Sequence, residues 1–387
     1  MKNKKHLVYV SQSLLSSNKA NSVHVINMTS ALAKYCNVTL IHAYQLKDPN
    51  LNRKIFSDFG KNIDVFLKGL YWKNIPGYAV IYSFKAVLYL CFGIKNKVDI
   101  VYCRCMYSAF LLSMLGFYKI IYESHALPRT KLHVYLERKI FQAKSTSRII
   151  LITQELLKSY EVKFGKNFCS EKVSIFPDGA NEIDKELSLG SIALRNIVLK
   201  GSYIFYGGSL LPGKGVETIL KIASKAKNIE FVIAGGDSNS VEKLKGISTR
   251  NVTFLGKVQY KEMMVLQASA RILLLPNEPI VLTDSGRVNI GGWTSPLKMF
   301  EYMASGRPIV SSDLSVLKEV LVDNYNALLV CYDAIDEWII AIEKILSDNH
   351  LEKFLGDNAK RDLSANYTWD KRALRISRLW KNDAKGK

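Results

Sequence analysis

The chain has 387 residues, enough for two domains of ordinary size, and its 48% hydrophobic and 23% charged residues predict a globular protein with substantial cores. No apolar signal-peptide core follows the basic start, so we expect a cytoplasmic rather than a secreted protein. The net charge of +20 lies mainly in residues 1–186, where 27 basic residues stand against 13 acidic ones. Because no nucleic-acid-binding motif accompanies this excess, it favours an anionic membrane or a phosphorylated substrate over nucleic acid.

Strand-like and helix-like segments alternate through the first half of the chain. The predicted strands are Leu7–Val10, Val38–Ala43, Ile100–Tyr102, Lys119–Tyr122 and Ile149–Ile152. The predicted helices are His24–Lys34, Ile81–Phe92, Tyr107–Leu115 and Lys131–Gln142. Strands separated by helices form a parallel sheet covered on both faces, so this half is predicted to be an α/β domain.

Residues 75–94 carry a single charge, Lys85, and approach the length of a membrane span. A proline and a glycine near the start of this segment, and the buried-strand pattern that follows it, favour a core helix instead. The alternative is that the basic, aromatic lead-in Tyr71-Trp72-Lys73 lies at a membrane interface.

The alternation restarts in the second half. The predicted strands are Tyr203–Tyr206, Glu230–Ala234, Val252–Leu255, Ile272–Leu275 and Pro308–Ser311. The predicted helices are Val216–Lys225, Lys261–Ala268, Leu297–Ala304 and Ile335–Ser347. We therefore predict two Rossmann-like doubly wound domains, residues 1–183 and 184–366, followed by a C-terminal helix within residues 367–387.

The segment Thr294-Ser-Pro-Leu-Lys-Met-Phe-Glu-Tyr-Met-Ala-Ser-Gly-Arg-Pro-Ile-Val310 predicts a capped helix, a glycine stop and a buried strand. The start of such a helix offers free N–H groups to an anion. The residues of this start are Ser295, Pro296, Leu297 and Lys298. Glu301 follows on the same helix face, so the segment suits the diphosphate and the ribose of a sugar nucleotide. An ordinary capped surface helix would give the same local signals.

The loop Tyr206-Gly-Gly-Ser-Leu-Leu-Pro-Gly-Lys-Gly215 follows the first strand of the second half and precedes a helix. Glycines such as Gly208 permit a close approach of the backbone to a ligand, and Lys214 can contact a phosphate. The loop lacks the Gly-Lys-Ser/Thr ending of a P-loop, and a simple glycine turn is the alternative. Its position favours a site, because ligands gather outside the carboxyl ends of such strands.

Residues 206–215 and 294–310 together resemble the donor-binding motifs of retaining glycosyltransferases of the GT-B fold, family 4 type, in a Ser-Pro-Leu-Lys subgroup. The resemblance covers nearly the whole chain. It implies two Rossmann-like domains that face a cleft, and a C-terminal helix that crosses back to the first domain. It also implies that Glu301 binds the nucleotide ribose and that Lys214 contacts the diphosphate.

Two positions depart from that family's pattern. Trp293 stands where the family often has a glutamate that contacts the donor sugar, and Ser209 stands where an arginine usually contacts the diphosphate. We expect phosphate binding to rest on Lys214 and the helix start, with help from Lys298 or Arg287. The departures leave open whether donor binding is altered or activity is lost.

The resemblance extends to further site residues. It places His125 near the donor sugar with Glu123 beside it, so these two and Lys214 are the catalytic candidates. The backbone around Lys257 and Val258 is expected to contact the nucleotide base. The other candidates are Arg104 and Arg129 for an anionic acceptor and the loop of residues 11–24 for the leaving phosphate, whereas His24 itself is expected to be structural.

The implied reaction transfers a sugar, with retention of configuration, from a UDP- or GDP-linked donor to a saccharide or a polyprenyl-diphosphate-linked acceptor in cell-surface polysaccharide synthesis. Because the sequence shows no metal-ligand cluster, positive side chains are expected to replace a divalent ion. The basic first half suggests peripheral association with the inner face of the cell membrane. The alternatives are a GT-B sugar-nucleotide epimerase and a non-catalytic nucleotide-sugar-binding subunit.

Overall fold

The computed structural model describes residues 4–17, 19–45, 55–57, 59, 64–94, 98–166, 171–183, 202–282 and 289–382. The chain divides into two compact units. Unit 1 comprises Met1–Pro177 together with Trp369–Lys387, and unit 2 comprises Asp178–Thr368. The first division therefore lies a few residues before the predicted one at 183/184, and the C-terminal helix belongs to unit 1.

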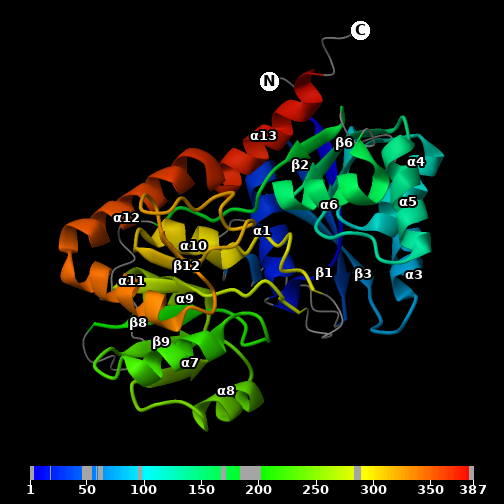
Figure 1. The fold of residues 1–387 in the computed structure, drawn as a ribbon. Helices are drawn as coiled ribbons and strands as arrows, with labels where there is room; N and C mark the ends of the chain where they lie inside the picture. Colours follow the sequence, from blue (N-terminus) through cyan, green and yellow to red (C-terminus); the bar gives the residue numbers. More distant parts are fainter. Residues whose placement is uncertain are drawn as a thin grey trace. The chain divides into compact units, whose positions relative to one another are not determined.

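Unit 1 is built on a seven-stranded parallel sheet with the order β3-β2-β1-β4-β5-β6-β7 (Figure 1). Its strands are β1 (His6–Leu14), β2 (Asn37–Tyr44), β3 (Val65–Tyr71), β4 (Ile100–Cys103), β5 (Lys119–Ser124), β6 (Thr146–Leu151) and β7 (Val173–Ile175). The central strand β4 is buried along its whole length, as expected for a parallel strand covered on both faces.

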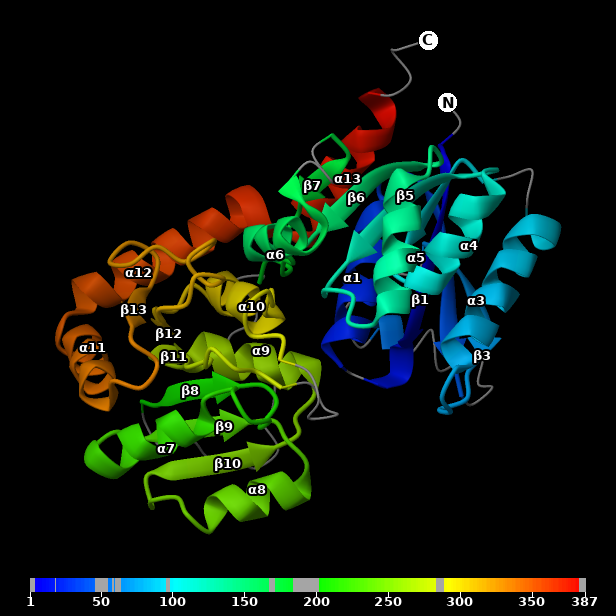
Figure 2. The same ribbon diagram turned by 45° about the vertical axis from the view of Figure 1, so that its right-hand side comes forward.

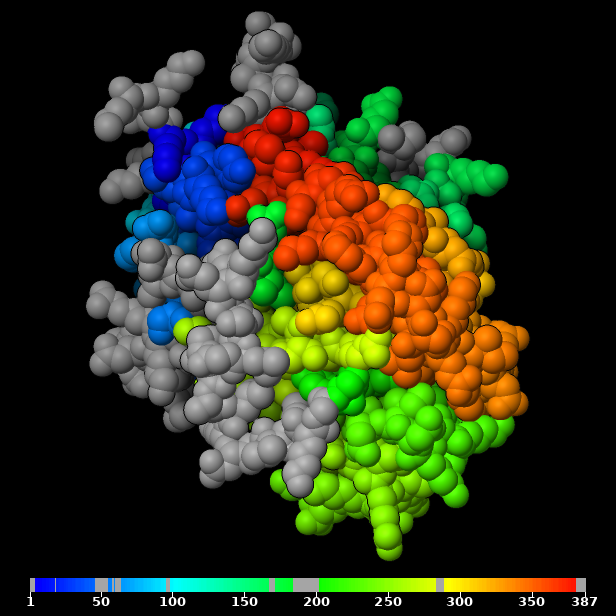
Figure 3. All heavy atoms as spheres, turned by 90° about the vertical axis from the view of Figure 1, so that its left-hand side faces the viewer, coloured from blue at the N-terminus to red at the C-terminus, as the bar shows by residue number. Residues whose placement is uncertain are grey.

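Helices cover both faces of the unit 1 sheet. They are α1 (Ala20–Ala33), α3 (Tyr78–Leu88), α4 (Met106–Leu115), α5 (Lys131–Gln142), α6 (Gln154–Phe164) and α13 (Trp369–Asn382). The helices α3, α4 and α5 lie side by side (Figure 2). The C-terminal helix α13 packs against α1, and its red atoms adjoin the blue atoms of the first residues of the chain in Figure 3.

Unit 2 contains a six-stranded parallel sheet with the order β10-β9-β8-β11-β12-β13. Its strands are β8 (Ile204–Gly207), β9 (Phe231–Ala234), β10 (Val252–Gly256), β11 (Ile272–Leu275), β12 (Ile309–Ser312) and β13 (Leu328–Val330). Its α-helices are α7 (Val216–Lys225), α8 (Ser238–Lys245), α9 (Tyr260–Ser269), α10 (Leu297–Ser305), α11 (Ile335–Ser347) and α12 (Asn349–Asp362). One hydrophobic core packs α7, α8 and α11 on the sheet, and a second packs α9 and α10.

The structure confirms the predicted fold class, with two doubly wound parallel sheets and a C-terminal helix that returns to the first of them. Local signals explain many helix starts, since the side chains of Thr130, Thr153, Asp237 and Asp348 accept hydrogen bonds from the first turns of α5, α6, α8 and α12. The elements that were not predicted are β3, β7, β13, α6, α8 and α12.

The helix α3 corrects the prediction of a core helix at residues 75–94. One face of α3 is buried through Tyr82 and Ala86, but the other face exposes large apolar side chains to solvent. Phe84 is 57% exposed, and Phe92 in the following helical turn is 84% exposed. Among the described residues, no helix combines the length and the apolar character that crossing a bilayer requires.

Candidate functional site

Unit 2 holds Lys214 in a tightly packed glycine loop after β8. Gly213 and Gly215, on either side of the lysine, have positive φ angles of 82° and 78°. A Cβ atom at Gly213 would lie 1.9 Å from the Ile280 carbonyl oxygen, and one at Gly215 would lie 1.7 Å from the Pro276 carbonyl oxygen. These positions therefore require glycine, and they fix the backbone of Lys214 against the segment that follows β11.

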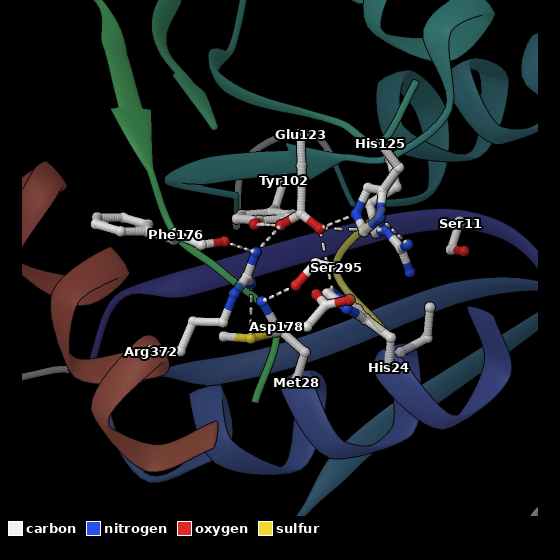
Figure 4. Close-up of polar contacts among 12 residues, drawn as sticks. Ser11, His24, Met28, Tyr102, Glu123, His125, Phe176, Asp178, Ser295 and Arg372 are labelled. Carbon is white, nitrogen blue, oxygen red and sulfur yellow. Dashed lines mark hydrogen bonds and ion pairs between the residues drawn. The ribbon is translucent and has the colours of Figure 1, made fainter. Parts of the chain in front are cut away.

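The start of α10 differs from its predicted capping. Pro296 occupies the cap position, and no side chain makes a capping hydrogen bond. The Ser295 hydroxyl instead accepts a hydrogen bond of 3.1 Å from the backbone N–H of Asp178, as Figure 4 shows. Because no described side chain caps the helix start, the backbone N–H groups of Leu297 and Lys298 remain available to an anion, whereas that of Met299 donates to the Pro296 carbonyl.

Lys298 is a buried cation at this helix start. Its Nζ lies 4.2 Å from the centre of the Tyr206 ring and has no hydrogen-bond partner among the described residues. Burial lowers the pKa of the Lys298 ammonium well below its usual range, and the charge of Lys214 lowers it further. The two lysines thus converge at one place in unit 2, where a phosphate would relieve their repulsion and supply the missing hydrogen bonds.

Glu301 lies one turn along α10 from Lys298. Burial raises the pKa of the Glu301 carboxyl to about 7, and the neighbouring Gln267 side chain opposes this rise. Its charge also acts on the buried hydroxyls of Tyr260 and Tyr302. The carboxyl therefore sits in an apolar setting, where a pair of hydroxyl donors would stabilise its ionised form.

The structure places the other predicted residues of unit 2 near strand ends. Gly208 and Ser209 follow β8, and the Ser209 carbonyl accepts a 2.8 Å hydrogen bond from the Tyr206 hydroxyl. Lys257, which is exposed, and Val258 lie between β10 and α9. Trp293 lies in the turn before α10. Arg287 falls outside the described residues. Ligand contacts of all these residues stay predictions.

Unit 1 contains an ionic cluster centred on Glu123, at the carboxyl end of β5 (Figure 4). The Glu123 side chain is fully buried. Its Oε2 accepts hydrogen bonds from the Tyr102 hydroxyl and from Nη2 of Arg372, the latter at 3.0 Å. Its Oε1 contacts Nε2 of His125 and lies 3.2 Å from Nε2 of His24.

Arg372 reaches Glu123 from the C-terminal helix α13. Its Nε donates to the Pro177 carbonyl at 2.9 Å, and its Nη2 also contacts the Phe176 carbonyl at 3.2 Å. Burial alone would raise the pKa of the Glu123 carboxyl, but the charges of Arg372, His24 and His125 hold that pKa well below its usual range. Glu123 is therefore an anion at neutral pH, and it is no candidate for a general acid.

The hydrogen bonds fix the tautomer of His125. Nη2 of Arg104 lies 3.3 Å from Nδ1 of His125, and a guanidinium can only donate. In the neutral ring Nδ1 must therefore accept, so the single ring proton sits on Nε2 and points to Glu123. Both ring nitrogens of His125 are thus engaged within unit 1, which suits a positioning role better than proton transfer.

His24, Glu123 and His125 also form a group whose ligand atoms lie within 4.8 Å of one another. Such a donor set can bind a transition metal. Here, however, the carboxylate already contacts two guanidinium groups, Arg372 at 3.0 Å and Arg104 at 3.4 Å. Adding a cation to this positive surrounding is unfavourable, so these residues fit an ion pair better than a metal site.

Sequence reasoning did not find Arg372 and assigned His24 a structural role. Both contact Glu123, although Arg372 is 249 residues away in the sequence. His24 also packs against Trp369, with ring centres 5.0 Å apart. No spacing rule in the sequence links Arg372 or His24 to Glu123. The usable signal was that residues at the carboxyl ends of parallel strands meet at the same edge of the sheet.

Comparison with known proteins gives unit 2 a family. Residues 201–348 match the family model described as Glycosyl transferases group 1. This part of the chain, which contains Lys214, Lys298 and Glu301, is therefore a glycosyltransferase group 1 domain.

Relatives extend the similarity over most of the chain. An uncharacterized glycosyltransferase of Methanocaldococcus jannaschii is 25% identical over 331 residues, which cover 79% of this chain and 81% of the relative. The solved structure of sucrose-phosphate synthase from Thermosynechococcus elongatus has a TM-score of 0.73 at 16% identity, covering 99% of this chain and 100% of that one. Anabaena HepE in complex with UDP has a TM-score of 0.71 at 13% identity, covering 98% and 100%. The chain has the GT-B fold of these proteins.

Proposed function

We propose that the protein is a retaining, metal-independent glycosyltransferase that uses a nucleoside-diphosphate sugar. The observation that carries this proposal is the buried Lys298 ammonium, which has no hydrogen-bond partner among the described residues and lies near Lys214 at the uncapped start of α10. A diphosphate supplies the charge and the acceptors that this place lacks. The presence of these residues in a glycosyltransferase group 1 domain supports the choice.

Each part of the donor has a proposed contact in unit 2. The diphosphate is bound by Lys214, Lys298 and the first N–H groups of α10, and the ribose hydroxyls donate to Glu301. The base lies beside the backbone of Lys257 and Val258. The complex of Anabaena HepE with UDP supports a uridine nucleotide, although a guanosine nucleotide offers the same diphosphate and ribose.

The proposed reaction breaks the bond between the anomeric carbon and the β-phosphate oxygen, and the acceptor oxygen bonds to that carbon from the same face. The acceptor's proton passes to the departing phosphate, so no side-chain base is required. Fixed lysine charges and helix N–H groups stabilise the leaving diphosphate in place of a metal ion. His125 and Glu123 are assigned a positioning role rather than proton transfer, because both His125 nitrogens are already engaged.

A donor screen tests this proposal. Purified protein is incubated with a panel of UDP- and GDP-sugars in the presence of EDTA, and the release of nucleoside diphosphate is measured with and without lipid-linked or saccharide acceptors. We expect acceptor-dependent release that EDTA does not abolish, with retention of configuration by NMR. Acceptor-independent conversion of the sugar would indicate the epimerase alternative, and no turnover with any donor would favour a non-catalytic binding subunit.

Variants localise the donor site. We expect Lys298→Met and Glu301→Ala to weaken donor binding by about tenfold or more, because each removes a charge-assisted hydrogen bond. Lys243→Met is the matched control, since Lys243 lies exposed on α8. Full turnover by Glu301→Ala would contradict the ribose assignment.

The proposed acceptor is a polyprenyl-diphosphate-linked saccharide at the inner face of the cell membrane. The exposed side chains of α3 and the turn that follows it form an apolar stripe, which consists of Val80, Ile81, Phe84, Leu88 and Phe92. Residues 64–119, which contain this stripe, have seven basic and two acidic residues. An apolar stripe in a segment of the sequence that is rich in basic residues is suited to an anionic lipid interface.

Liposome flotation tests the membrane part of the proposal. We expect the wild-type protein to float with vesicles that contain anionic lipid and the Phe84→Ser, Phe92→Ser double variant to remain in solution. Val162→Ser is the control, because Val162 is apolar and, at 89%, more exposed than either phenylalanine but lies on α6. No preference of the wild-type protein for anionic vesicles would remove the support for this acceptor.

A further inference from the structure

Arg104 is a buried cation in unit 1 whose hydrogen-bonding capacity is only partly used. It follows β4, and its side chain is 7% exposed. Its backbone N–H donates to the Val10 carbonyl at 3.0 Å, which fixes it beside β1. Its Nη2 contacts His125 and its Nε lies 3.4 Å from Oε1 of Glu123, but Nη1 has no hydrogen-bond partner among the described residues.

Tyr9 provides a second polar atom of this cluster whose hydrogen-bonding capacity is not fully used. Its ring stacks on Tyr102 with the centres 4.8 Å apart, and its hydroxyl is buried without a hydrogen-bond partner in the described parts of the chain. Burial raises the pKa of this hydroxyl, and the nearby Arg104 guanidinium opposes the rise. The Tyr9 oxygen and the Arg104 guanidinium thus interact with each other, but both groups are donors and neither has a further acceptor among the described residues, which is rare in a folded protein.

The charges of the cluster do not balance. Glu123 is the carboxylate that the described contacts of Arg104 reach, and Arg372 and Tyr102 already contact its Oε2. The contacts of Arg104 with this carboxylate are the longer ones, at 3.4 Å. One carboxylate thus faces two guanidinium groups, and burying a positive charge is costly unless an anion compensates it fully.

We infer that Arg104 and Tyr9 form a binding site for a phosphate group. Nη1 of Arg104 and the Tyr9 hydroxyl would donate to its oxygens, and the guanidinium would neutralise its charge. The site lies at the carboxyl end of β4, where open α/β sheets bind their ligands. Its use in sugar transfer rests on the proposed function, and there the phosphate belongs either to the acceptor or to the departing nucleotide.

Histidine NMR of the full chain tests the site directly. The chain has six histidines, and His125 contacts Arg104, so its imidazole signal reports on this cluster. Inorganic phosphate is titrated into protein labelled at the histidine Cε1 atoms, and the His125 signal is identified with a His125→Gln variant. We expect a saturable shift of the His125 signal in the wild-type protein.

Matched variants separate this site from the lysines of unit 2. We expect Arg104→Gln to weaken the phosphate-dependent shift by about tenfold or more, and Tyr9→Phe to weaken it by several fold. Arg138→Gln removes the same charge from an exposed position on α5 and should leave the titration unchanged. If Arg104→Gln does not fold, Arg104→Lys keeps the charge but loses the planar fork, and it should still bind phosphate more weakly than the wild type.

A competition arm identifies the source of the phosphate. If UDP shifts the His125 signal and blocks the phosphate titration, the site binds the departing nucleotide. If phosphate still binds with unchanged affinity to UDP-saturated protein, the site belongs to an acceptor phosphate. Equal titrations of wild-type and Arg104→Gln protein, or no shift of His125 in the wild type, would overturn the inference. Phosphate binding at Arg104 without any glycosyl transfer would support the inferred phosphate site but refute the proposed function.

Discussion

Replacement of Arg372 by methionine is expected to destabilise unit 1 strongly and in a pH-dependent way. Methionine keeps much of the side-chain length but removes the guanidinium that bonds Glu123 at 3.0 Å and the Pro177 carbonyl at 2.9 Å. The carboxylate is fully buried, so no water can replace the lost partner. Breaking a buried ion pair by removing one partner costs roughly 3–5 kcal/mol, and we expect a loss of unfolding free energy in this range at pH 7.5.

The sign of the pH dependence follows from the pKa of Glu123. In the wild type this pKa is lowered, so its contribution to stability is present above the unfolded pKa near 4.5 and is lost as the pH falls below it. Without Arg372, we expect burial to raise the pKa of the Glu123 carboxyl. The folded variant is then most stable when Glu123 is protonated, and its unfolding free energy falls as the pH rises. The difference between wild type and variant should therefore shrink from pH 7.5 to pH 5.5.

Urea unfolding at both pH values, followed by circular dichroism and by tryptophan fluorescence, measures this difference. Trp369 packs against His24, so the fluorescence includes a reporter within the cluster. The control is Arg378→Met, which removes the same charge from an exposed position on α13. Adding Glu123→Gln to the Arg372 variant should restore part of the stability and remove most of the pH dependence. An equal loss at pH 5.5 and pH 7.5, or no effect of Glu123→Gln, would refute the reasoning.

Two further predictions concern α10. Because burial lowers the pKa of Lys298 and a bound diphosphate would raise it, UDP binding should take up protons over the pH range between the two pKa values, and calorimetry in buffers of different ionisation enthalpy would detect this uptake. Lys298→Met should abolish it. The pKa of Glu301 is raised from 4.5 to about 7, so its contribution to stability is present below pH 4.5 and is lost as the pH rises through 7. Glu301→Gln should match the wild type at about pH 4 and exceed its unfolding free energy at pH 8.5 by on the order of 3 kcal/mol; equal stability at both pH values would contradict this.

The parts of the fold that the sequence predicted well are those with complete local signals. The predicted bounds of α5, α7 and α11 agree with the structure, because each combines an apolar face with clear turn residues at its ends. The strand β3 was not predicted because it mixes apolar residues with Lys68 and Gly69 and is only partly buried. Its place in the sheet comes from pairing with β2, which local patterns do not report.

The site residues likewise divide into features that local sequence patterns predicted and features that depend on the folded structure. The spacing of Lys298 and Glu301 on one helix face was readable, as was the glycine loop around Lys214. Their protonation was not, because it depends on burial and on Gln267, which lies on another helix, α9. The partnership of Arg372 with Glu123 joins residues 249 positions apart, and it exists only after the C-terminal helix has packed against α1.

Lys298 in unit 2 and Arg104 in unit 1 share one physical property. Folding removes each cation from water and leaves at least one of its donors without a hydrogen-bond acceptor among the described residues. Each arrangement lowers the stability of its own unit, since an unfilled buried donor costs about 1–3 kcal/mol. Natural cores rarely contain such unsatisfied donors, and a ligand that binds the folded state can offset their cost. Because a phosphate matches both cations in charge and in acceptor geometry, we expect each of the two proposed sites to bind a phosphate group of the substrate.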